Sequence, residues 1–97
     1  MNYQPYRLSN KFELDFWEIQ DWLYDHEPWV RTQKTIDSIL EKLDYISQNP
    51  FAYPLATYPE GDNHEVRKAV HFKTYLIFYV VHIDFVEFIS IIHGKRQ

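Results

Sequence analysis

The chain has 97 residues, a formal net charge of −4 and no cysteine, and its residues are 45% hydrophobic and 19% aromatic. This length accommodates one domain, residues 1–97, and the many large rings exclude a disordered chain because they can bury enough surface for a core. Without cysteine, disulfides and thiolate chemistry are excluded. We expect a cytoplasmic protein without membrane contact, since no apolar run approaches about 18 residues and the first residues do not resemble a secretory leader.

Charge is distributed unevenly along the chain. Residues 1–63 contain eleven acidic and five basic residues, whereas residues 64–97 contain three acidic and five basic residues together with four of the five histidines. Such a split favours contact of the C-terminal part with an anion, a phosphate or an acidic partner. The alternative is that the strands and turns predicted there carry these cations without any partner.

The first two predicted elements are a short strand and a helix. The stretch YQPYRLS, residues 3–9, alternates in polarity, and Pro5 favours an edge strand or a strand start. Residues 10–27 have a helical apolar period, and Asn10 followed by Glu13 predicts a capping box. We expect the core stripe of this helix to consist of Phe12, Phe16, Ile19 and Leu23.

The remaining side chains of this helix are mostly acidic or aromatic. Its carboxylates predict a solvated face, with docking of a basic partner as the alternative. Trp17 and Trp22 lie off the core stripe and are expected to pack against the following helix, unless they mark a partner surface. The predicted acidic face consists of Asp15, Glu18, Asp21 and Asp25.

A second helix is predicted to begin near Pro28 and to end at Asn49 and Pro50, because apolar residues recur every three or four positions between them. The two helices then form an antiparallel hairpin. Residues 50–63 contain three prolines and predict a loop. Its aromatic residues, which we expect to anchor the loop on the sheet, are Phe51, Tyr53 and Tyr58.

Three strands complete the predicted fold. Residues 64–71 alternate in polarity, whereas residues 75–83 and 85–93 are almost continuously apolar, which is typical of strands covered on both faces. Ile83 and Asp84 predict a tight hairpin between the last two strands. The order β-α-α-β-β-β therefore predicts an α+β fold, with the helical hairpin packed on one face of a small, mostly antiparallel sheet.

Candidate functional side chains gather on these last three strands. The chain has neither a glycine-rich phosphate loop nor a zincin or serine-elbow pattern, and its histidines lack ligand spacing, so we expect no metal and no cofactor. Antiparallel neighbours bring a strand start beside a strand end, which places Tyr75 near His93. The candidate site consists of Arg67, His93 and Arg96 as catalytic residues and of Lys73, Tyr75 and Lys95 as binding residues.

This set of side chains suits a phosphodiester. Arg67 and Arg96 would hold phosphate oxygens bidentately, and His93 would act as a general acid or base. Tyr75 would stack on a base or donate a hydrogen bond. In the structural alternative, Arg67 pairs with a helix carboxylate, His93 caps a strand end, and Lys95 and Arg96 form a solvated tail.

The chain resembles the RelE/ParE family of toxins from bacterial toxin–antitoxin modules over nearly its whole length. The resemblance rests on the order and spacing of LDYISQNP (43–50), VRKAVHFKTYLIFYVV (66–81) and FVEFISIIHGKR (85–96). It implies a β-α-α-β-β-β fold and a cognate antitoxin that wraps and neutralises the toxin. In one branch of the family, a ribosome-dependent nuclease cleaves messenger RNA, and arginines matching Arg67 and Arg96 stabilise the attacked phosphate. Another branch poisons DNA gyrase and lacks the nuclease residues.

The ParE-like branch fits this chain better than the nuclease branch. The loop 51–63 contains no lysine, and the chain is acidic, whereas proteins that bind ribosomal RNA are usually basic. The long helical hairpin is also similar to the gyrase-poisoning branch. We therefore expect a growth-inhibiting toxin that acts on gyrase or on translation, as a homodimer or in a hetero-oligomer with its antitoxin. The alternatives are a metal-independent endoribonuclease acting on ribosome-bound or free mRNA, and an inactive family member that only binds a partner or dimerises.

Overall fold

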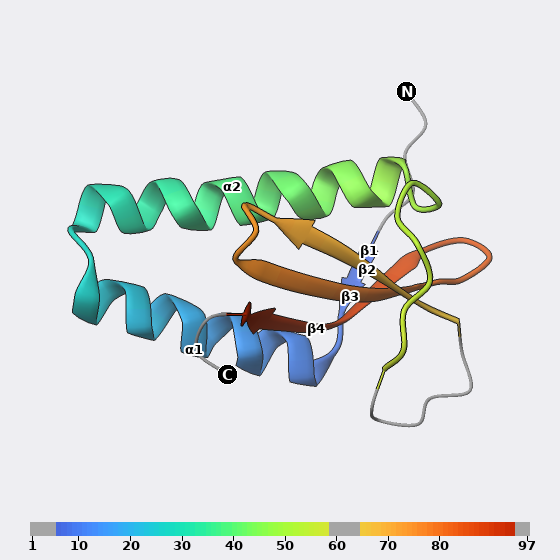
Figure 1. Ribbon diagram of the computed structural model, residues 1–97, viewed down its shortest axis with the longest axis horizontal. Coiled ribbons are helices and arrows are strands. Elements are labelled where there is room, and N and C mark those ends of the chain that lie inside the picture. Colours follow the sequence, from blue (N-terminus) through green and yellow to red (C-terminus); the bar gives the residue numbers. More distant parts are fainter. Residues whose placement is uncertain (1–5, 59–64, 95–97) are drawn as a thin grey trace.

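The computed structural model describes residues 6–58 and 65–94, which form two helices and one four-stranded sheet (Figure 1). No helix in this described part is long and apolar enough to cross a lipid bilayer. The order β-α-α-β-β-β and the packing of the helical hairpin on a mixed sheet confirm the predicted α+β fold. The elements are β1 (Tyr6–Leu8), α1 (Asn10–His26), α2 (Trp29–Gln48), β2 (Val66–His71), β3 (Tyr75–Val81) and β4 (Val86–His93).

The sheet has the strand order β1-β4-β3-β2, so β3 and β4 are its central strands. β2–β3 and β3–β4 pair antiparallel, whereas β1 pairs parallel with β4 from Tyr6 opposite Val86 to Leu8 opposite Phe88. The predicted edge position of the first strand and the predicted hairpin between the last two strands are confirmed. Pro5, on which the edge prediction partly rested, lies outside the described residues.

The α1 helix begins one residue earlier than the capping-box pattern predicts. Ser9 is its N-cap, and the Ser9 hydroxyl accepts a hydrogen bond from the Phe12 backbone N–H at 3.0 Å. The same hydroxyl donates to the Ile89 carbonyl of β4 at 3.2 Å, so this cap also ties the helix to the sheet. The prediction of Asn10 as the cap is wrong because Asn10 is already helical. The α2 helix follows after a two-residue joint, with Pro28 as its N-cap.

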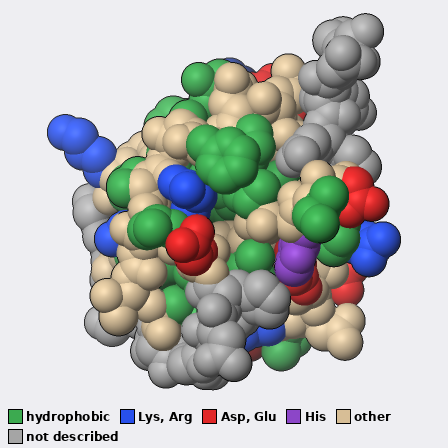
Figure 2. All heavy atoms as spheres, turned by 90° about the vertical axis from the view of Figure 1, so that its right-hand side faces the viewer, with side chains coloured by type: hydrophobic (Ala, Val, Ile, Leu, Met, Phe, Trp, Pro, Cys, Tyr) green, Lys and Arg blue, Asp and Glu red, His purple; other side chains and the backbone are tan. Residues whose placement is uncertain are grey.

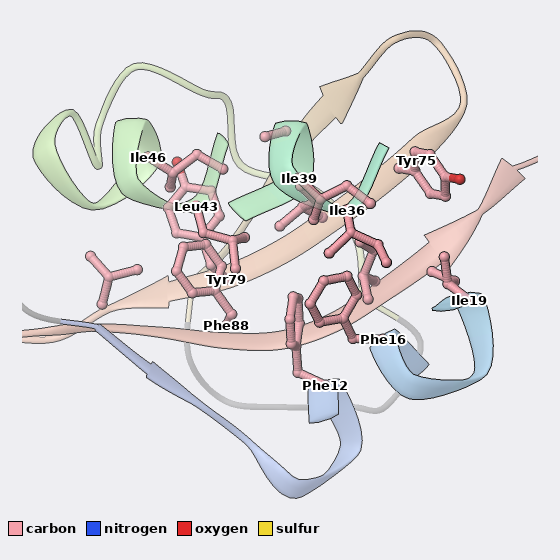
Figure 3. Packing of buried hydrophobic residues seen from close by; sticks show 14 of the residues in the cluster. Phe12, Phe16, Ile19, Ile36, Ile39, Leu43, Ile46, Tyr75, Tyr79 and Phe88 are labelled. Atoms are coloured by element: carbon pink, nitrogen blue, oxygen red, sulfur yellow. The ribbon is translucent and has the colours of Figure 1, made fainter. Parts of the chain in front are cut away.

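The core lies between the helical hairpin and one face of the sheet (Figure 3). All four residues of the predicted α1 stripe are buried, and they meet buried side chains of α2, β3 and β4 there. A smaller cluster on the opposite sheet face contains Val66, Phe78 and Val80, with Tyr58 packed against it. The central strand β3 therefore buries side chains on both faces, as its continuous apolar pattern predicts.

The structure corrects three local predictions of side-chain packing. Trp17 does not pack against α2, since 62% of its surface is exposed. Trp22 packs instead beside the core, where its ring stacks on His26 of its own helix at a centroid distance of 4.2 Å. In the loop, Tyr53 and Tyr58 pack against the two core clusters as expected, but Phe51 is exposed.

Candidate functional site

Tyr75 and His93 face each other across the β3–β4 ladder, as their antiparallel positions predict. Their rings meet edge to face with centroids 5.1 Å apart. The row of rings continues in both directions, from His93 to Trp22 at 6.2 Å and from Tyr75 to His71 at 6.5 Å. A row of histidine and aromatic rings, which we call the ring row, therefore runs from Trp22 of α1 over the end of β4 and the start of β3 to His71 at the end of β2.

The other predicted binding residues are placed differently around this pair. Tyr75 is only 4% exposed and its ring belongs to the main core, so its ring cannot stack on a base from solution. Lys73 is exposed in the β2–β3 turn rather than at the start of β3. The Gly94 N–H donates to the Thr74 carbonyl at 2.7 Å, which fixes the chain where it leaves β4. Lys95 and Arg96 follow this point and lie outside the described residues.

Arg67 lies at the other end of the sheet from His93. It stands opposite Tyr79 in the β2–β3 ladder, whereas His71, four residues further along β2, stands opposite Tyr75. Four residues of strand span ~13 Å, so Arg67 and the Tyr75–His93 pair do not share a site. The structure does not bring together the two predicted catalytic residues that it describes, Arg67 and His93.

The Arg67 guanidinium is occupied by structural contacts. Its Nη1 donates to the Tyr53 carbonyl at 2.6 Å, and its Cζ lies 5.0 Å from the centre of the Phe51 ring. The anticipated ion pair with a helix carboxylate is not among its contacts in the described part of the chain. Arg67 instead holds the segment that follows α2 against the sheet.

Tyr79 shares this structural environment with Arg67. Its hydroxyl donates to the Pro50 carbonyl at 2.7 Å, and its side chain is fully buried. Burial raises the pKa of Tyr79 to about 12, although the nearby Arg67 cation opposes this rise. Tyr79 is therefore neutral at physiological pH and acts as a hydrogen-bond donor that anchors residue 50.

The molecular surface near residues 50–58 and the β3–β4 turn is mixed in character. Figure 2 views the molecule from this end, which lies on the right in Figure 1, and shows hydrophobic side chains interspersed with charges of both signs. A nucleic-acid surface usually concentrates positive charge. This end of the sheet, where Arg67 lies, therefore does not have the appearance of a phosphate-binding surface.

A groove lies between α1 and the edge of β4 beyond β1. It has a volume of about 370 Å³. At its wall the Asp15 carboxylate accepts hydrogen bonds from Lys11 at 2.9 Å, from Ser90 Oγ at 3.0 Å and from the Ile91 backbone N–H at 3.2 Å. The sequence predicts that Asp15 belongs to a solvated acidic face, and this prediction is wrong. Asp15 instead ties α1 to a stretch of the β4 edge that β1 does not pair with. The lining residues are Lys11, Asp15, Glu18, Ile19, Ile91, Ile92 and His93.

His71 is the buried histidine of the ring row. It is 8% exposed, and its Nε2 lies 3.1 Å from the Ser38 hydroxyl of α2. Burial lowers the pKa of His71, and the Lys42 ammonium lowers that pKa further. The ring is therefore neutral at neutral pH. His71 is not among the candidate residues predicted from the sequence.

Sequence reasoning missed two of these groups. No local pattern distinguishes Asp15 from its exposed neighbours, because its two partners on β4, Ser90 and Ile91, lie 75 and 76 residues away along the chain. His71 does fall on the inward side of an alternating strand, which is the one signal that could have marked it as buried.

A helical hairpin covers one face of a four-stranded sheet whose last strand ends at His93, and Lys95 and Arg96 follow it in the sequence. This arrangement is the one expected of the small toxins of the RelE/ParE type. The chain belongs to one family of this class. The model of the ParE toxin of type II toxin–antitoxin systems, parDE, matches residues 6–97.

A solved structure has the same fold. A chain of the chromosomal ParDE TA system from P. aeruginosa superposes with a TM-score of 0.76 and 16% sequence identity, covering 94% of this chain and 96% of that chain. No curated protein sequence matches this chain. The resemblance to the ParE-like branch is thereby confirmed at the level of the family and the fold.

Proposed function

We propose that this protein is the toxin of a type II toxin–antitoxin module, that it arrests bacterial growth by acting on DNA gyrase in the cytoplasm, and that a cognate antitoxin neutralises it. Membership of the ParE toxin family supports the toxin assignment. The position of Arg67 supports gyrase over RNA as the target, and it is the observation that carries this choice.

Cleavage of RNA by this chain would need a phosphate clamp and an acid or base at one phosphate. Catalytic groups act within hydrogen-bond reach of the reacting atoms, at about 3 Å. Arg67 stands opposite Tyr79, not in the rung of Tyr75 and His93, and its guanidinium is held by Tyr53 and Phe51. A nuclease would therefore have to work without the arginine that the RNA-cleaving branch uses.

The surface proposed to contact the target is the end of the sheet that carries the ring row. His93 is partly exposed there, Lys73 is exposed in the adjoining turn, and Lys95 and Arg96 come after Gly94, the residue that follows β4 in the sequence. In this proposal Tyr75 supports His93 from the core rather than contacting the target itself. This end also lies in the C-terminal, more basic part of the chain.

The proposed antitoxin would cover the groove between α1 and β4. β1 pairs with β4 only as far as Phe88. Beyond this residue the Ile91 N–H donates to the Asp15 carboxylate and not to a neighbouring strand. An extended segment can add to such an edge, and an amphipathic helix can fill an apolar groove. Because His93 lines the groove, a bound antitoxin would also mask the surface proposed for the target.

The first test is inducible expression of the chain in bacteria, with pulse-labelling of DNA and protein synthesis. The proposal expects growth arrest with DNA synthesis failing first, and gyrase-dependent DNA cleavage by the purified protein. A His93→Gln variant is expected to weaken both effects. A His82→Gln variant is the matched control, because His82 lies beside Glu87 at the opposite end of the β3–β4 hairpin.

The outcomes separate the proposal from its alternatives. Arrest in which protein synthesis fails first, with RNA cut by the purified chain, would replace gyrase by RNA and make the protein a metal-independent endoribonuclease. Continued growth with a folded product would indicate a family member that only binds a partner.

The nuclease remains the second candidate for one reason. Lys95 and Arg96 follow His93 by two and three positions in the sequence, so an acid–base group and two cations belong to one short stretch of the chain. A direct assay of RNA cleavage by the purified chain, in the presence of a chelator, tests this candidate independently of growth.

A further inference from the structure

A second groove lies on the other side of the helical layer, between α2 and the β2–β3 turn. It has a volume of about 430 Å³. Rings of Tyr45 and Phe72 stand among its walls, and the buried His71 ring lines it from β2. The lining residues are Ser38, Glu41, Lys42, Tyr45, His71 and Phe72. His71 also belongs to the ring row at the proposed target surface, whereas the α2 residues and Phe72 are given no part in the toxic activity.

The turn that supplies Phe72 has an unfavourable backbone for its sequence. Phe72 and Lys73 both have φ of 56°, and the Thr74 N–H donates to the His71 carbonyl at 3.0 Å. Positive φ at both central residues defines a type I′ turn, which normally contains Asn and Gly because side chains with a Cβ are strained there. A phenylalanine and a lysine in these positions point to a requirement other than stability.

This backbone displays the Phe72 ring at the mouth of the groove. The ring is 69% exposed, although one face stacks on His71 at a centroid distance of 4.1 Å. An exposed aromatic ring held by a neighbouring ring loses little conformational entropy when a partner binds, which is typical of an anchoring contact.

The hydrogen bonds of His71 leave one acceptor available. The Ser38 hydroxyl donates its proton to the Thr35 carbonyl at 2.8 Å, so it must accept from His71 Nε2 at 3.1 Å. This assigns the proton of the neutral ring to Nε2 and makes Nδ1 the acceptor. Nδ1 has no hydrogen-bond partner within residues 6–58 and 65–94, and the residue is buried, with 8% of its surface exposed. A ligand that carries a donor would satisfy this atom.

Charge around the groove favours a negatively charged partner. Lys42 lines the groove with its ammonium 4.9 Å from the Tyr53 ring centre, and Lys73 follows Phe72 in the turn. Neither lysine has an ion-pair partner in the described part of the chain, nor does Glu41, which also lines the groove. The lining itself carries one cation, Lys42, and one carboxylate, Glu41, and Lys73 in the adjoining turn is the second cation that an acidic segment could reach.

We propose that this groove binds a tryptophan or tyrosine side chain from an acidic segment of a partner protein. The bound ring packs between Phe72 and Tyr45, its N–H or O–H donates to Nδ1 of His71, and a neighbouring carboxylate of the segment pairs with Lys42 or Lys73. This inference goes beyond the proposed function, since it requires neither gyrase nor RNA as the target.

The lining favours a protein segment over a nucleotide. A nucleotide could also stack on Phe72, but its phosphate carries more negative charge than a single carboxylate and is repelled more strongly by Glu41 of the same lining. A peptide can place its carboxylate on the side of the two lysines and keep apolar atoms beside Glu41. The comparison of an acidic peptide with a nucleotide is therefore the decisive one.

The test is a titration of the ¹⁵N-labelled full chain, followed by amide chemical shifts. The probes are acetyl-Glu-Trp-Asp-amide, acetyl-Lys-Trp-Lys-amide and adenosine monophosphate. The acidic peptide is expected to give saturable shifts confined to residues 38–45 and 71–73, with about tenfold weaker binding of the lysine peptide. Binding of the nucleotide in preference to the acidic peptide, or no shifts at millimolar peptide, would overturn the proposal.

Two variants separate binding from folding. Replacing Phe72→Asn and Lys73→Gly together is expected to raise the midpoint of thermal unfolding and to abolish binding of the acidic peptide. A Val70→Ala variant is the control, because Val70 is also exposed but points to the opposite sheet face. Unchanged peptide affinity in the folded double variant would show that Phe72 is not the anchor and would refute the assignment.

Discussion

The Ser90 hydroxyl of β4 donates a hydrogen bond to the Asp15 carboxylate of α1 at 3.0 Å, across 75 residues of sequence. The same carboxylate oxygen also accepts from the Ile91 N–H. Replacing Asp15→Ala leaves the buried Ser90 hydroxyl and the Ile91 N–H without this acceptor, so we expect a loss of about 1–3 kcal/mol in the free energy of unfolding. Urea denaturation measures it, and Asp21→Ala on the exposed side of the same helix is expected to change stability by less than about 0.5 kcal/mol.

Replacing a lysine by glycine is expected to stabilise the protein in the β2–β3 turn and to destabilise it within β2. Lys73→Gly is expected to stabilise the protein by about 1 kcal/mol, because glycine adopts the positive φ of this residue without strain. Lys68→Gly, in the middle of β2, is expected to destabilise it by about 0.5–1 kcal/mol. Urea denaturation of both variants provides the comparison, and equal destabilisation by both would contradict the strained turn.

His71 predicts a loss of stability on mild acidification. Its pKa in the folded protein is lowered by burial and by Lys42, so the unfolded chain binds more protons as the pH falls below the ordinary value of 6.5. The free energy of unfolding should therefore fall as the pH decreases through 6.5 towards the lower pKa of the folded state. The groups around the ring that bear on this titration are Ser38, Lys42, Phe72 and Tyr75.

Urea midpoints at pH 7.5, 6.5 and 5.5 test this pH dependence. A His71→Gln variant should show a smaller fall between the first and the last pH, because glutamine does not titrate. The His82→Gln variant should retain the fall caused by His71. If the wild type and His71→Gln lose stability in parallel, another group is responsible.

In addition to the loss of stability that His71 predicts at low pH, the raised pKa of Tyr79 predicts a loss of stability at high pH. Its pKa rises from 10.0 to about 12 on folding, so the unfolded chain loses this proton first and stability falls between pH 10 and 12. The shift corresponds to on the order of 2–3 kcal/mol. Tyr79→Phe should lower stability at pH 8 by about 1 kcal/mol, since it removes the bond to the Pro50 carbonyl, but should reduce the alkaline loss. Urea denaturation at pH 8 and pH 11 distinguishes the two effects.

Replacing Arg67 is expected to lower the stability of the protein without removing its toxicity. Arg67→Met removes the hydrogen bond to the Tyr53 carbonyl and the contact with the Phe51 ring, which should cost about 1–3 kcal/mol. Growth arrest should persist at equal amounts of folded protein, because the proposed function gives Arg67 no contact with the target. Arg31→Met, which breaks an exposed pair with Glu27, is the matched control for stability. Loss of arrest in folded Arg67→Met would restore the nuclease hypothesis.

Local periodicity determined the elements of this fold. The spacing of Phe12, Phe16, Ile19 and Leu23 predicts the buried face of α1, and all four residues are buried. The continuous apolar run of β3 likewise predicts a strand covered on both faces. These predictions succeed because a helix and a strand repeat every 3.6 and 2.0 residues, so burial follows from positions close together in the sequence.

Strand register and strand order belong to the tertiary structure. The sequence places Arg67 and His93 on nearby strands of one sheet, but only the register sets Arg67 opposite Tyr79 and His93 opposite Tyr75. It is also the parallel pairing of β1 with β4 that leaves the edge near Ile91 for Asp15. A residue pattern shows which side chains share a face, whereas the separation of those side chains along a strand depends on pairings between distant segments. The sequence alone therefore determined the family, the elements and the core stripe, and the tertiary contacts decided which polar side chains meet.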